Sequence, residues 1–101
     1  MTPTDRRAHR AARIAHARTR LPARSWLRAR IEPLILAGQS DDQVARQIAT
    51  ALDGLFALDR LIPGPVGQLA EAVDGDILYA VALPIVKGVR RAMVKAQIVH
   101  G

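Results

Sequence analysis

Arginine is the residue type whose number and spacing most favour chemistry in this 101-residue chain, and that chemistry is anion binding. Residues 1–30 hold nine arginines against one acid, residues 31–86 two arginines against eight carboxylates, and residues 87–101 four cations and no acid. The net charges of these three segments are therefore +8, −6 and +4. A cation-rich segment without interspersed acids is typical of an arm that binds a polyanion such as the nucleic acid backbone.

Two basic stretches carry this prediction, one in the N-terminal arm and one in the last helix. If the arm is helical, Arg6, Arg10 and Arg13 fall near one face, and a face of like charges repels itself unless an anion lies against it. Aromatic residues are absent from residues 1–25 and 80–101, so contact with a duplex backbone fits better than stacking on single-stranded bases. The predicted polyanion-binding residues are Arg6, Arg7, Arg10, Arg13, Arg18, Arg20, Arg24, Arg28, Lys87, Arg90, Arg91 and Lys95.

The same charge pattern supports an alternative function, a structural or assembly subunit of a virion or another homo-oligomeric particle. The basic arm of one subunit would then dock on the acidic middle of its neighbour. Residues 77–86 strengthen this alternative, because the segment is apolar on all sides and a domain of this size has little interior to bury it. The predicted protein interface consists of Ile77, Leu78, Tyr79, Val81 and Leu83.

Catalytic and metal-ligating patterns are missing from the sequence. The three histidines, His9, His16 and His100, lie in basic terminal segments where a general base would be neither positioned nor desolvated. Ser40 is better explained as a helix cap than as a nucleophile, and there is no cysteine to ligate a metal. We therefore predict a non-enzymatic protein with no catalytic residue, metal site or cofactor.

Helices are the elements expected to position the basic side chains, because apolar residues recur at helical spacing and no strand-like alternation is present. The clearest helix start is Ser40, an N-cap whose capping box is completed by Gln43. That helix either ends at Gly54 or continues toward Ile62. The other expected helices cover residues 6–20 with Thr4 as N-cap, 22–38 with Pro33 as a kink or split, 65–75, and 76–99 with Asp76 as N-cap and Pro84 as a kink.

The expected fold is an all-α domain, small and orthogonal or bundle-like, with three to four helices. Residues 1–21 form its basic arm, helical or disordered, and residues 22–101 form the single helical domain. The more apolar of the two longest uncharged runs, residues 77–86, is too short to span a membrane. No apolar signal-peptide core follows the basic N-terminus. We expect a cytoplasmic protein, or one within a particle assembled there.

Overall fold

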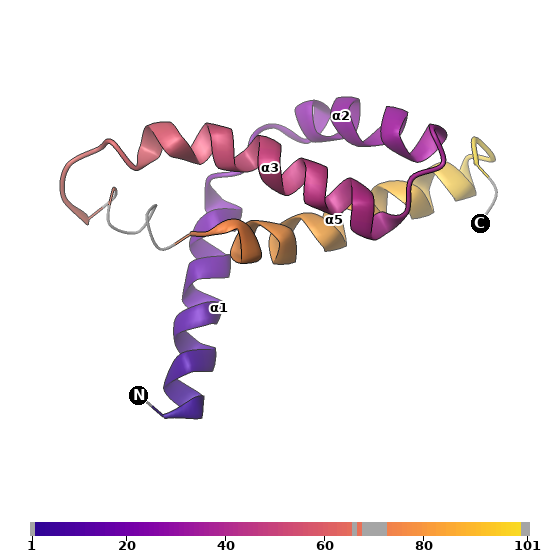
Figure 1. Cartoon of the computed structure of the whole chain (residues 1–101). Helices are drawn as coiled ribbons and strands as arrows, with labels where there is room; N and C mark the ends of the chain where they lie inside the picture. Colours follow the sequence, from indigo (N-terminus) through magenta and orange to yellow (C-terminus); the bar gives the residue numbers. More distant parts are fainter. Residues whose placement is uncertain (1, 66, 68–72, 100–101) are drawn as a thin grey trace.

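The computed structural model describes residues 2–65, 67 and 73–99, and within them the chain forms four helices and no strand (Figure 1). The predicted all-α fold is thereby confirmed. The short helix expected over residues 65–75 falls largely outside the described residues. The helices are α1 (Pro3–Thr19), α2 (Arg24–Leu36), α3 (Asp41–Asp59) and α5 (Gly75–Lys95).

Polar side chains cap three of these helices. Ser40 and Gln43 form the predicted capping box at the start of α3, each bonding the backbone N–H of the other. The cap of α1 is Thr2 with Asp5, and the cap of α5 is Asp74, whose carboxylate accepts a hydrogen bond from the Ile77 N–H at 2.9 Å. The predictions of Thr4 and Asp76 were therefore each two residues late, because both sequences offer an earlier oxygen-bearing side chain in the N-cap position.

Proline and glycine interrupt the helices less than the sequence suggests. Helix α2 begins after Pro22 at Arg24, with no side-chain cap, and continues through Pro33 to Leu36. It closes as predicted at Gly38, whose φ of +85° suits glycine, and the Gln39 N–H then reaches back to the Leu34 carbonyl at 3.2 Å. Helix α3 passes through Gly54 and ends at Asp59, and α5 passes through Pro84.

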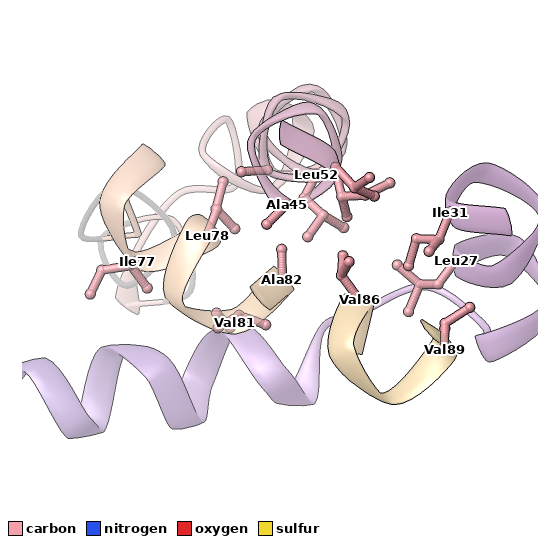
Figure 2. Close-up of a cluster of buried hydrophobic side chains, with 14 of the residues drawn as sticks. Leu27, Ile31, Ala45, Leu52, Ile77, Leu78, Val81, Ala82, Val86 and Val89 are labelled. Atoms are coloured by element: carbon pink, nitrogen blue, oxygen red, sulfur yellow. The ribbon is translucent and has the colours of Figure 1, made fainter. Parts of the chain in front are cut away.

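The core lies between α2, α3 and α5, each of which contacts the other two (Figure 2). Ala45 of α3 and Ala82 of α5 are fully buried, and their small side chains allow the two helices to approach closely. Leu27 and Ile31 of α2 lie beside Val89 on the second half of α5. The buried side chains of the described residues are aliphatic apart from Phe56 and Met93, and none is polar or charged.

Helix α1 runs steeply across α5, the one described helix against which it packs, while Arg20 just beyond its end bonds Asp59 of α3 (Figure 1). Only its C-terminal part is anchored: Ala17 is fully buried and Ile14 is half-buried against the core. In Figure 2 the ribbon of α1 passes beside Val81 of α5. The N-terminal turns of α1 extend away from the body of the molecule. The boundary between arm and core therefore falls inside α1, because Ala17 belongs to the core.

Three of the residues predicted to form a protein interface belong to the core of the single chain. Ile77, Leu78 and Val81 are at most 2% exposed, so they offer no surface to a partner. They are covered because α3 packs along one side of α5 while α1 crosses another. Tyr79 and Leu83 are half-buried, and for these two the interface stays a prediction.

Within the described part of the chain, no helix is both long and apolar enough to cross a membrane.

Candidate polyanion-binding surfaces

Every carboxylate between residues 31 and 60 is paired with an arginine of the same chain. Each of these five pairs has a nitrogen-to-oxygen distance of 3.0 Å or less. Two of them join neighbouring turns of one helix, and the other three join residues further apart in the sequence. The pairs are Arg20–Asp59 at 2.7 Å, Arg28–Glu32 at 2.7 Å, Arg46–Asp42 at 3.0 Å, Arg60–Asp53 at 2.7 Å and Arg90–Asp41 at 2.5 Å.

Three of the twelve predicted polyanion-binding residues therefore have structural partners. Arg90 is held most firmly, since it also donates to the Gln39 carbonyl at 2.7 Å and so ties α5 to the start of α3. Arg20 joins the end of α1 to the end of α3, and its hydrogen bond holds the pKa of the Asp59 carboxyl below its usual value. Arg28 is bonded to its own helix neighbour Glu32.

The remaining nine predicted residues form no ion pair within the described residues, and they fall into two groups. The first group, which we name the α1 surface, consists of Arg6, Arg7, Arg10, Arg13 and Arg18. All five are on α1, and all are exposed except Arg13, which is half-buried.

One face of α1 changes from basic to buried along its length. Arg6, Arg10, Arg13 and Ala17 follow one another at steps of four, three and four residues and so share that face. It packs on α5 at Ala17 and becomes purely basic where α1 has left the core. The only acid of the helix, Asp5, is engaged with Thr2 in the capping box and does not pair with an arginine.

The second group, named the α5 surface, consists of Lys87, Arg91, Lys95 and Arg24. The three α5 residues repeat every four positions and are all exposed, so they form one continuous stripe. Arg24 lies on α2, across a hollow of about 260 Å³ that is bordered by Pro84 and Gly88 of α5.

The two surfaces lie on different parts of the molecule. In Figure 1 the N-terminus is at the free end of α1, whereas the C-terminus follows the far end of α5. The sequence left open whether both basic stretches lie on one side and form a single surface. The structure separates them, and the ion pairs of α3 lie on the body of the molecule between the two ends.

A third feature is a groove of about 620 Å³ between α3 and the start of α5. Tyr79, which lines this groove, donates its hydroxyl to Asp42 at 2.6 Å, and Arg46 lies 5.5 Å from the Tyr79 ring centre. The hydrogen bonds from Tyr79 and Arg46 lower the pKa of Asp42, and the same Tyr79 bond raises the pKa of the phenol. Sequence reasoning missed this pair, because its partners are 37 residues apart and on different helices.

The groove is lined by two acids, Asp53 and Asp76, as well as by Tyr79 and Arg46. Among the described residues, no group of three or more His, Asp and Glu side chains lies close enough together to hold a metal ion. A contact that the sequence could have predicted is Arg30 over the Trp26 ring at 4.1 Å, since the two residues are four apart on α2.

Comparisons with protein-family models, curated proteins and solved structures found no match to this chain.

Proposed function

We propose that this protein is a non-enzymatic polyanion-binding protein whose α1 surface binds the nucleic acid backbone. The observation that carries the proposal is the partition of charge in the fold. The five carboxylates between residues 31 and 60 are neutralised by arginines of the chain, while the five arginines of the α1 surface have no ion-pair partner among the described residues. Five of the cations without an ion pair among the described residues therefore lie on a helix that extends from the body.

Backbone contact suits such a surface better than base recognition. Guanidinium groups match phosphate geometry with two parallel hydrogen bonds, and each bound phosphate releases condensed counterions into solution. Residues 6–18 carry only arginine, alanine, histidine and Ile14, and a row of like cations matches the uniform charge of the phosphates, whose contacts carry no sequence information. We therefore expect binding to be independent of base sequence.

The experiment is a titration of a labelled short duplex with the protein at several salt concentrations. If the protein contacts about six phosphates, log affinity should fall against log salt with a slope near −5. Replacing three exposed arginines with glutamine, R6Q/R7Q/R10Q, should make that slope shallower by about 2.7, because each contact contributes about 0.9. Duplexes of unrelated sequence should give the same slope.

A matched control keeps the charge and adds the same side chains. Ala8, Ala11 and Ala12 are exposed on α1, so the variant A8Q/A11Q/A12Q introduces three glutamines without removing an arginine. Its slope should equal that of the unaltered protein, and circular dichroism should show equal helix content in both triple variants. Absence of binding at low salt, a flat salt dependence, or an equal loss in the control would refute the proposed function.

A further inference from the structure

The outer ends of the two basic surfaces are separated by more than the range over which exposed charges act together. Helix α1 crosses α5 near Val81 in Figure 2, and its anchoring residue is Ala17. At a rise of 1.5 Å per residue, Arg6 lies about 16 Å along α1 from Ala17. Lys95 lies about 21 Å along α5 from Val81. Because the helices run in different directions, the surfaces diverge from their crossing point (Figure 1).

Screening makes the outer ends of these surfaces electrostatically independent. The Debye length at physiological ionic strength is about 8 Å, which is shorter than either of the two helix lengths above. The body between them has paired carboxylates, and the molecule as a whole measures 46 × 30 × 18 Å. A phosphate backbone on one surface would therefore neither be held by the other nor strongly repel an anion bound there.

The α5 surface has the form that a second backbone requires. Lys87, Arg91 and Lys95 are spaced about 6 Å apart along α5 and extend over about 12 Å. A duplex presents one phosphate about every 3.4 Å along each strand, so such a stripe can follow several phosphates of one strand. Arg24, on the other side of the hollow beside Gly88, adds a cation from a second helix. Arg90 is already paired with Asp41, so the contact with a phosphate backbone falls to Lys87, Arg91, Lys95 and Arg24.

We infer that the protein bridges nucleic acid, holding one duplex segment on the α1 surface and a second on the α5 surface. The inference rests on the proposed function, since it assigns the second of two sites to the same ligand class. It adds a property that one basic surface does not provide: a single chain brings two duplexes together.

The test measures energy transfer between two short duplexes, one carrying a donor dye and the other an acceptor, mixed with the full chain. Transfer should rise as protein is added and fall again when protein exceeds duplex, because each duplex then binds its own protein molecules. The variant K87Q/R91Q/K95Q should lose most of the transfer while retaining binding to a single duplex. The variant R6Q/R7Q/R10Q should also lose the transfer.

A matched control on α5 is A92Q/A96Q, which adds glutamines at two exposed positions beside the stripe and removes no charge. It should bridge as well as the unaltered protein, with an unchanged melting temperature in all variants. Transfer that persists in K87Q/R91Q/K95Q would overturn the inference, since bridging would then come from paired proteins with one site each. If the unaltered protein binds a single duplex but gives no energy transfer, the bridging inference is overturned and the proposed function stands. If the unaltered protein binds no duplex, both the inference and the proposed function are refuted.

Discussion

At the scale of single residues, the structure distinguishes cations that the sequence presents as equivalent. Arg90 and Arg91 are neighbours in the same basic stripe, yet Arg90 is bonded to Asp41 and Arg91 has no ion pair within the described residues. Helical spacing predicts which face of α5 each residue occupies, but not which acid of another helix that face meets. For this reason three of the twelve predicted residues form ion pairs within the fold, and the other nine form none within the described residues.

The titration of the Tyr79 phenol reports directly on one contact between α3 and α5, because Tyr79 is the only tyrosine of the chain. Its neutral hydroxyl donates to the Asp42 carboxylate, so ionising the phenol would remove the bond and place two negative charges together. The pKa of Tyr79 should therefore lie above the usual value of about 10. Near-ultraviolet absorbance of the phenolate follows this titration, and Asp42→Asn should bring the pKa back toward 10.

The sign of the pH dependence follows for both partners. The raised pKa of Tyr79 means that its contribution to stability is complete below about pH 10 and is lost as the pH rises through the folded value. The lowered pKa of Asp42 means that its contribution is complete above about pH 4 and is lost as the pH falls through the folded value. Asp76→Asn is the control, since Asp76 borders the same groove without bonding Tyr79. An equal effect of both substitutions would contradict the assigned hydrogen bond.

At the scale of elements, residues within one turn of a helix end predicted some of the helix ends. The packing of the helices against one another was not predictable from such local residues. Ser40 with Gln43 predicted the start of α3, and Gly38 predicted the end of α2, because both depend on residues within one turn. The anchoring of α1 was not predicted. Ala17 has no distinctive side chain, and its burial depends on α5, more than 55 residues further along the chain.

Truncation of α1 tests where the arm ends and the core begins. Removing residues 1–10 takes away three arginines and leaves the half-buried Ile14 and the buried Ala17 in place. The free energy of unfolding should then change by less than about 1 kcal/mol, while the salt slope of duplex binding becomes shallower by about 2.7.

Removing residues 1–20 should behave differently. This deletion also removes Ala17 and Ile14 and uncovers Val81, so the lost apolar burial should lower the free energy of unfolding by about 2 kcal/mol. Urea unfolding followed by circular dichroism measures both truncations. Equal stability of the two shortened chains would show that α1 contributes nothing to the core.

At the scale of the whole molecule, the five carboxylates between residues 31 and 60 do not form an open acidic surface. The segment from residue 31 to residue 60 contains five carboxylates and two arginines, and it receives three more arginines from α1, α2 and α5 or their adjoining residues. Charge counted along the chain therefore overstates the negative charge available to a partner. The all-α class was predictable because helical spacing and composition are sequence properties, whereas this neutralisation arises only in the folded chain.

The assembly alternative can now be tested against that neutralisation. Docking of a basic arm on a neighbouring subunit requires open carboxylates, and those of α3 are all engaged with arginines of their own chain. Since weak electrostatic association strengthens as screening falls, lowering the salt concentration is the sensitive condition. We expect light scattering of the protein alone to give the mass of a single chain at both low and high salt. A mass that rises at low salt in the unaltered protein and not in R6Q/R7Q/R10Q would favour assembly through the arm over nucleic acid binding.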